Sequence, residues 1–206
     1  MPLQNRVTPE GEIVATPHRG TLMGNRGCLH DAAGSIRHPF TLRRWIHCVL
    51  QFKGRRRAVM TPGRYTELFF LDEATALAAG HRPCAECQRE RYRLFREHWV
   101  AARGIASMPS AETLDVVLHD ERLEAGTAKR THLAELAGLP SGAMIAGPDD
   151  RVWLVLGPRV LEWTPAGYRS TGRPSLPAQV RVLTPRSIVA AIGHGYTVGV
   201  HFSAGA

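Results

Sequence analysis

A pair of cysteines separated by two residues, Cys84 and Cys87, constrains the fold of this chain more than any other feature. The pair stands in the segment AAGHRPCAEC at residues 78–87, directly after a short predicted helix. In such a knuckle the backbone turns back, so that both sulfurs point at one ion and nearby peptide N–H groups hydrogen-bond the thiolates. Pro83 fixes one φ angle just before the first cysteine, and Gly80 accepts the positive φ that ends the preceding helix. The sequence therefore predicts half of a zinc site.

The chain has two further cysteines, Cys28 and Cys48, and the total of four equals the ligand number of structural zinc. We therefore predict a zinc site made by Cys28, Cys48, Cys84 and Cys87. Two alternatives stay open for the knuckle: a thioredoxin-type redox pair, and simple burial of two small side chains. The redox pair is disfavoured because a helix ending at Gly80, and not a strand, precedes the motif.

Residues 66–87, TELFFLDEATALAAGHRPCAEC, resemble the second half of the Ada-type zinc-binding domain, the N-terminal module of bacterial alkylation-response DNA repair proteins. In that family two aromatic residues lead into a short alanine-rich helix, then Gly, an Arg-Pro-Cys and a second Cys. The matching positions are Phe69, Phe70, Ala74, Ala79, Gly80, Arg82, Pro83, Cys84 and Cys87. The resemblance implies that Cys84 and Cys87 are zinc ligands and that Arg82 lies near DNA phosphate.

The first half of the family motif is different in this chain. The family takes its other two ligands from a Cys-x-x-x-Cys pair, one of which accepts a methyl group from a DNA phosphotriester. Here Cys48 is followed four residues later by Phe52, so the second cysteine of that pair is missing. We expect Cys28 to supply the fourth ligand, with His47 or His30 as alternatives, and we do not expect self-methylation of Cys48.

The charge of the chain points to an anionic partner. Lys and Arg total 26 against 18 Asp and Glu, a formal net charge of +8, and nucleic acid is the commonest partner of such a protein. Arginines gather around Cys48 and in and after the knuckle. We expect DNA to be gripped through the guanidinium groups of Arg43, Arg44, Arg55, Arg56, Arg57 and Arg82. The alternative is a set of solvated faces in an arginine-biased composition, since the chain has only two lysines.

The elements and their order predict an α+β fold, a small zinc-stapled α/β module followed by helices and a short β-meander. We predict a flexible arm at 1–22, an Ada-like zinc-binding module at 23–104, and a helical segment with a C-terminal α+β region at 105–206. Predicted helices cover 73–79 with Asp72 as N-cap, 88–103, 111–125 with Ser110 as N-cap, 129–137, and 185–193 after Thr184. Predicted strands cover 44–52, 56–60, 64–71, 143–146, 152–156, 160–163 and 180–183.

Several function classes lack their signatures here. The chain has neither a Gly-x-x-x-x-Gly-Lys-Ser phosphate loop nor a Gly-x-Ser-x-Gly nucleophile elbow. His119, Asp120 and Glu121 invite a metal-nuclease interpretation, but adjacent helical residues do not share a face. No secretory h-region and no apolar run of membrane-spanning length is visible, so we expect a cytoplasmic protein without membrane contact.

These observations favour a zinc-binding, basic protein that binds nucleic acid and acts on DNA in repair or damage response. The alternative is a nucleic-acid-processing enzyme, a DNA glycosylase or nuclease, that uses the zinc module as a structural staple. A third class is a module that binds protein or small molecules without nucleic acid. Oligomeric state and catalytic residues are not indicated by the sequence.

Overall fold

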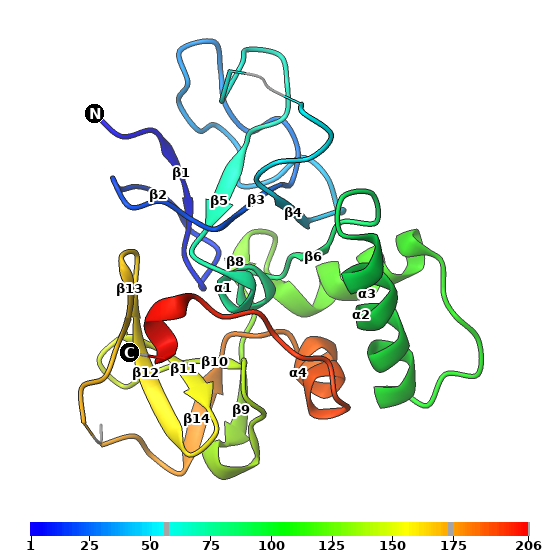
Figure 1. The fold of residues 1–206 in the computed structure, drawn as a ribbon, viewed down its shortest axis with the longest axis vertical. Coiled ribbons are helices and arrows are strands. Elements are labelled where there is room, and N and C mark those ends of the chain that lie inside the picture. The colour runs from blue at the N-terminus through cyan, green and yellow to red at the C-terminus, as the bar shows by residue number, and fades with distance from the viewer. Residues whose placement is uncertain (56–57, 173–174, 206) are drawn as a thin grey trace.

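The structure is a computed structural model that describes residues 1–55, 58–172 and 175–205. In this part of the chain, four α-helices combine with two six-stranded sheets and a small two-stranded one (Figure 1). The α+β class predicted from the sequence is confirmed. None of the helices in these residues has the length and apolar character that a membrane crossing requires.

The first sheet has the strand order β2-β1-β5-β3-β4-β6. Its strands are β1 (Gln4–Val7), β2 (Ile13–Ala15), β3 (Leu22–Asn25), β4 (Ile46–Val49), β5 (Leu68–Phe70) and β6 (Arg82–Pro83). Pairing is antiparallel except for β1 with β5 and β4 with β6, which are parallel. The parallel pair β4–β6 matters most, because it sets Cys48 beside the knuckle.

The N-terminal segment differs from the expectation. Residues 1–22 were expected to form a flexible arm, but β1 and β2 lie within them and β1 pairs with β5 through Arg6 and Phe69. Val7 and the side chain of Asn5 are buried there. The strand is short and its partner lies some sixty residues later in the chain, so no local pattern marks it.

The second sheet is antiparallel throughout, with the order β13-β12-β11-β10-β14-β9. It contains the predicted meander as β10 (Met144–Ala146), β11 (Val152–Leu156), β12 (Arg159–Thr164) and β14 (Gln179–Val182), together with β9 (His132–Glu135) and β13 (Gly167–Arg169). The helix expected at 129–137 is wrong. β8 (Ala128–Lys129), β9 and the 3-10 turn η1 (Leu136–Gly138) occupy these residues, since β9 pairs with β14 and this tertiary pairing overrides helix propensity.

The remaining predicted strands are shortened. The run 44–52 contains only β4, and 64–71 contains only β5. Of the strand expected at 56–60, residues 56–57 lie outside the described part of the chain, and residues 58–60 are not in a strand. The two-stranded sheet pairs β7 (Leu123–Glu124) with β8, directly after the third helix.

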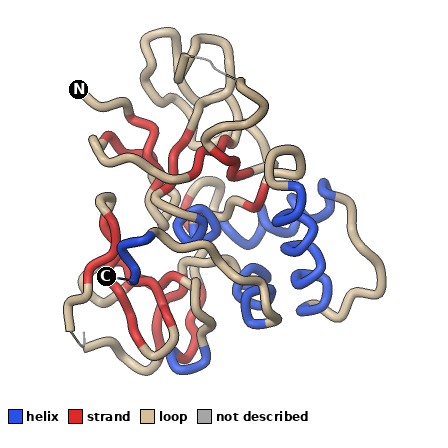
Figure 2. Tube along the Cα trace, viewed as in Figure 1, coloured by secondary structure: helices blue, strands red, loops and turns tan. Residues whose placement is uncertain are grey.

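The helices are α1 (Glu73–Ala78), α2 (Arg89–Ala102), α3 (Ala111–Arg122) and α4 (Arg186–Gly193), with a 3-10 turn η2 (Phe202–Gly205) near the C-terminus. Figure 2 shows α2, α3 and α4 gathered on one side of the sheets. The predicted caps are confirmed for α1 and α3, where Asp72 and Ser110 accept hydrogen bonds from the N–H groups of Thr75 and Thr113. The cap of α4 is Pro185, one residue later than expected, because the Thr184 hydroxyl accepts a bond from the Met144 N–H.

Helix α1 is the centre of the molecule, and every residue in it is buried. Its alanines allow close packing on several sides. Ala74 and Ala78 belong to a cluster with Met144 and other residues of the second sheet, whereas Ala76 packs in a cluster with residues of the first. Leu77 packs in a third cluster with residues of α2, α3 and α4. The predicted parts 23–104 and 105–206 therefore share one core.

The acidic residues at the start of α1 anchor the C-terminal segment. Asp72 accepts hydrogen bonds from the Tyr168 hydroxyl and the His201 N–H, both at 2.8 Å. Glu73 accepts hydrogen bonds from the Tyr196 hydroxyl at 2.6 Å and the Gly199 N–H at 2.7 Å. Two buried carboxylates thus hold β13 and the segment 196–201 against α1.

Candidate metal centre

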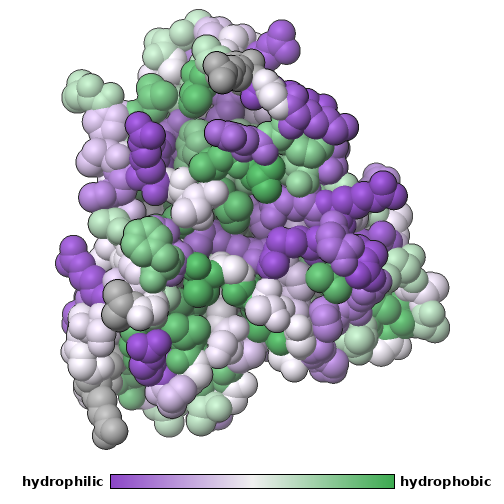
Figure 3. All heavy atoms as spheres, in the orientation of Figure 1, coloured by the Kyte–Doolittle hydropathy of each residue, from purple (hydrophilic) through white to green (hydrophobic). Residues whose placement is uncertain are grey.

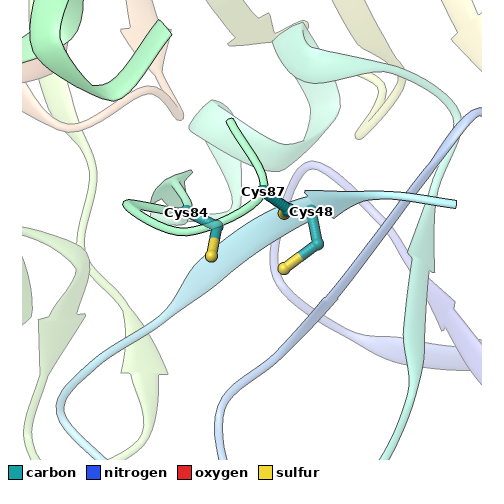
Figure 4. A group of neighbouring side chains, drawn as sticks. All are labelled: Cys48, Cys84 and Cys87. Atoms are coloured by element: carbon teal, nitrogen blue, oxygen red, sulfur yellow. The ribbon is translucent and has the colours of Figure 1, made fainter. Parts of the chain in front are cut away.

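Three thiols meet where β4 lies beside the knuckle. The sulfurs of Cys48, Cys84 and Cys87 all lie within 4.8 Å of one another (Figure 4). Cys48 and Cys84 are buried and Cys87 is half-buried, and none of the three forms a disulfide. Among the described residues this is the one group of three or more Cys, His, Asp or Glu side chains with such spacing.

Backbone pairing explains why these three thiols converge. In the parallel pair β4–β6, His47 lies opposite Pro83, and the Cys84 N–H continues the ladder with a 2.9 Å bond to the His47 carbonyl. The chain then turns, and the Gln88 N–H returns to the Cys84 carbonyl at 3.1 Å before α2 begins. The Glu86 N–H points at the sulfur of Cys84 from 3.4 Å. The knuckle is thus formed by hydrogen bonds of the polypeptide itself.

The spacing of the sulfurs fits a tetrahedral ion. Zn–S bonds of about 2.3 Å place two sulfurs about 3.8 Å apart around a tetrahedral centre, which lies inside the observed limit. Thiolate is a soft donor that suits zinc. The three side chains can therefore hold a metal ion such as zinc.

The ionisation of the thiols is uneven. A hydrogen bond from Cys48, together with the N–H groups of Cys87 and Glu86, lowers the pKa of Cys84 to about 5. The same bond to Cys84, with burial, raises the pKa of Cys48. Burial also raises the pKa of Cys87. The Cys84 thiolate forms readily, and its negative charge disfavours ionisation of Cys48 and Cys87. A bound divalent cation would stabilise all three as thiolates.

Cys28 does not join this group. It follows β3, five residues beyond Met23, which is the residue paired with Cys48, and its sulfur lies 4.0 Å from the His30 carbonyl. The expectation rested on matching four cysteines to four ligands. It fails because strand pairing carries Cys28 away from Cys48 instead of toward it.

The two histidines considered as alternative ligands have other partners. His47 neighbours Cys48 on β4, so its side chain lies on the opposite face, where Nδ1 is 2.9 Å from the side-chain nitrogen of Gln88. His30 contacts the hydroxyl of Thr66 through Nδ1 at 2.6 Å. The described residues therefore supply three donors to the centre, all of them sulfur.

Arg82 does not lie where the Ada-type resemblance implies. Its side chain is only 2% exposed and donates two hydrogen bonds to Asp115 of α3, at 2.7 and 2.8 Å. The guanidinium group also lies over the ring of Tyr92. Arg82 is therefore a core ion pair and is not available to phosphate. Asp115 was missed in the sequence, although a carboxylate on the apolar stripe of a helix, beside Leu114 and Leu118, signals a buried partner.

The other predicted arginines are placed differently from one another. Arg43 and Arg44 are exposed, just before β4. Arg55 is exposed and pairs with Glu86 of the knuckle at 2.7 Å. Arg56 and Arg57 lie outside the described residues.

The surface near the metal centre is polar but partly neutralised. Figure 3 shows hydrophilic side chains gathered over the region of the knuckle and α2. On α2, Arg93 pairs with Glu90 and Glu97, and Arg91 pairs with Glu73. Only part of the basic charge in this region is therefore free to attract an anion.

The cluster His119, Asp120 and Glu121 does not form a catalytic site. The His119 ring contacts Phe40 edge-on, Asp120 is exposed, and Glu121 accepts a hydrogen bond from the Ser187 N–H at 2.9 Å. Their side chains diverge, as expected for consecutive helical residues.

The comparisons with known proteins give no information on function. No protein-family model matches the chain, and neither the curated proteins nor the solved structures yielded a match.

Proposed function

We propose that this chain is a zinc protein whose metal is held by three thiolates, from Cys48, Cys84 and Cys87. The observation that carries the proposal is the convergence of these sulfurs from β4 and the knuckle within 4.8 Å. The fourth tetrahedral position falls to water or another small ligand, because the described residues offer no fourth side chain in the group.

The metal acts first as a staple. It joins β4 to the turn that opens α2, two segments that are also held together by the short parallel pair β4–β6 and by the side chain of Gln88, which contacts His47. Zinc bound to three thiolates carries a net charge of about −1, so neighbouring peptide N–H groups such as that of Glu86 add stability. Structural zinc contributes on the order of 10 kcal/mol to the folding of small sites.

Nucleic acid is the partner that we propose, and DNA in repair or damage response is the role suggested by the motif at residues 66–87. Support comes from the exposed Arg43 and Arg44, which lie two to three residues before the strand that carries Cys48, and from Arg55, which forms an ion pair with Glu86 of the knuckle. These arginines would contact phosphates and fix orientation without reading sequence.

Metal content tests the first part. Native mass spectrometry of the purified chain should find one zinc per chain, and Cys48→Ala, Cys84→Ala and Cys87→Ala should each lose it. Cys28→Ser is the matched control, since this thiol lies outside the group, and it should keep the zinc. A wild-type protein without metal, or loss of zinc in the control, would overturn the proposal.

Salt dependence tests the second part. Binding to a short DNA duplex should weaken steeply with salt, and Arg43→Ala with Arg44→Ala should reduce the slope of log K against log salt by about 1.8, since each phosphate contact contributes about 0.9. Arg159→Ala, an exposed arginine of β12, serves as the control. Absent or salt-insensitive binding would refute the nucleic-acid role.

A further inference from the structure

A cavity of about 730 Å³ is lined by residues other than the three clustered cysteines. Its walls come from the turn between β1 and β2, the loop that follows β3, the segment at β8 and the strand β14. The volume lies in the range of small-molecule sites. Its charged lining consists of the cations Arg26, Arg37, Lys129 and Arg181 and the carboxylates Glu10 and Glu12.

Arg26 and Lys129 of this lining form a group of three neighbouring cations with Arg122. Arg26 is 2% exposed and Arg122 is fully buried. Arg26 and Lys129 line both the large cavity and an inner one of about 40 Å³, which Arg122 also lines. The guanidinium groups of Arg26 and Arg122 lie over the ring of Trp45, with carbon-to-centroid distances of 4.5 and 4.1 Å.

These three cations have only neutral partners in the described part of the chain. Arg26 donates to the Gly11 carbonyl at 2.8 Å, Arg122 to the Gly80 carbonyl at 2.9 Å, and Lys129 to the Ala78 carbonyl. No described carboxylate forms an ion pair with any of them, and the Nε–H groups of Arg26 and Arg122 are buried without an acceptor. This differs from Arg82 nearby, which has Asp115.

The lowered pKa values of these side chains show that their environment disfavours the charged forms. Burial lowers the pKa of Arg26 to about 9, and burial together with the other two cations lowers the pKa of Lys129 to about 7. Carboxylates oppose this charge: Glu10 lines both cavities, Glu12 lines the large one, and Asp115 and Asp120 act on Arg122 from α3. In the lining of the large cavity the cations Arg26, Arg37, Lys129 and Arg181 outnumber the carboxylates Glu10 and Glu12, so the lining favours an anion.

We propose that this cavity binds a small molecule through a phosphate group held by Arg26 and Lys129, with Arg122 completing the positive charge behind them. Arg26 lines the cavity with a planar guanidinium fork, the geometry that suits phosphate oxygens, and its buried Nε–H has no acceptor among the described residues. The rest of the cavity has room for an organic part, and Ile13, Ile36 and Leu183 give it apolar walls. A phosphomonoester of nucleotide size fits this combination of charge, volume and lining.

The test uses the zinc-loaded 206-residue chain and calorimetric titration with inorganic phosphate, adenosine 5′-monophosphate and adenosine. Both phosphate probes should bind and adenosine should not. Lys129→Met, which keeps the side-chain length and removes the charge, should weaken phosphate binding at least tenfold. Lys53→Met is the matched control, because it changes the only other lysine, an exposed one, and it should bind as the wild type does.

A second measurement on the unmodified protein keeps the proposal testable if Lys129→Met does not fold. Acylation of the two lysines at neutral pH, followed by mass spectrometry, should slow at least fivefold at Lys129 when phosphate is present and stay unchanged at Lys53. Equal reaction with and without phosphate, or no binding at millimolar phosphate, would overturn the proposal. Equal protection of Lys129 by an oligonucleotide without terminal phosphate would also overturn it, in favour of nucleic acid as the ligand.

Discussion

The ion pair between Arg82 and Asp115 is the feature on which the structure and the family resemblance disagree most sharply. The pair is bidentate, at 2.7 and 2.8 Å, and its side chains are 2% and 8% exposed. Removing one partner of a buried pair leaves an uncompensated charge, at a cost of about 3–5 kcal/mol. We therefore expect Asp115→Asn to lower the free energy of unfolding by that amount.

Urea unfolding at fixed zinc concentration measures this loss directly, and for a chain of this size it corresponds to a fall in Tm of about 6–20 °C. Asp120→Asn is the matched control, being the same change on the exposed face of the same helix, and should have no measurable effect. Replacing both partners with apolar residues, Arg82→Met with Asp115→Leu, should recover most of the stability. A loss below about 1 kcal/mol for Asp115→Asn, the value of an exposed pair, would refute the buried position of Arg82.

Three further perturbations test other parts of the fold. Leu118→Ala, in the cluster between α1 and the outer helices, should cost about 2–5 kcal/mol in urea unfolding, and an undisturbed midpoint would contradict that packing. Tyr168→Phe removes the hydrogen bond from β13 to Asp72 and should lower the free energy of unfolding by about 1–3 kcal/mol; an unchanged value would contradict this contact. Burial holds the pKa of His81 well below its usual value, so below about pH 6.5 the unfolded chain binds a proton that the folded chain does not, and the free energy of unfolding should fall. His81→Leu should flatten this decline. Parallel curves of stability against pH for the two proteins would argue against the role of His81.

The sequence predicted those parts of the fold that depend on neighbouring residues. Asp72 and Ser110 were identified as caps because a side-chain oxygen and an N–H three residues away form a local motif. The strand at 152–156 was predicted with its observed bounds, since a run of apolar residues flanked by polar and glycine positions is itself a local signal. β1 and β9 were missed because each is defined by a partner far along the chain.

The site divides in the same way. The spacing of Cys84 and Cys87 was sufficient to place them together, whereas the position of Cys48 depends on the pairing of β4 with β6. Cys28 was included by counting, and counting ignores that a metal can take a ligand from solvent. Arg82 was expected near DNA phosphate because a short motif does not show that its partner is Asp115, on a helix some thirty residues later in the chain.

The structure shows that part of the positive charge of the chain is not on its outer surface. Of the chain's 26 lysines and arginines, Arg26 and Arg122 are buried and Lys129 is partly buried, so these three contribute little charge to the outer surface. The basic composition is therefore a weaker indication of nucleic acid than the sequence suggested.

The coordination of the metal tests the central claim most directly. X-ray absorption at the zinc edge of the purified protein counts the sulfur neighbours and measures their distances. We expect three sulfurs at about 2.3 Å and one oxygen or nitrogen at about 2.0 Å, unchanged in Cys28→Ser. Four sulfurs that fall to three in Cys28→Ser would contradict the three-thiolate centre, and a spectrum without zinc–sulfur bonds would remove it.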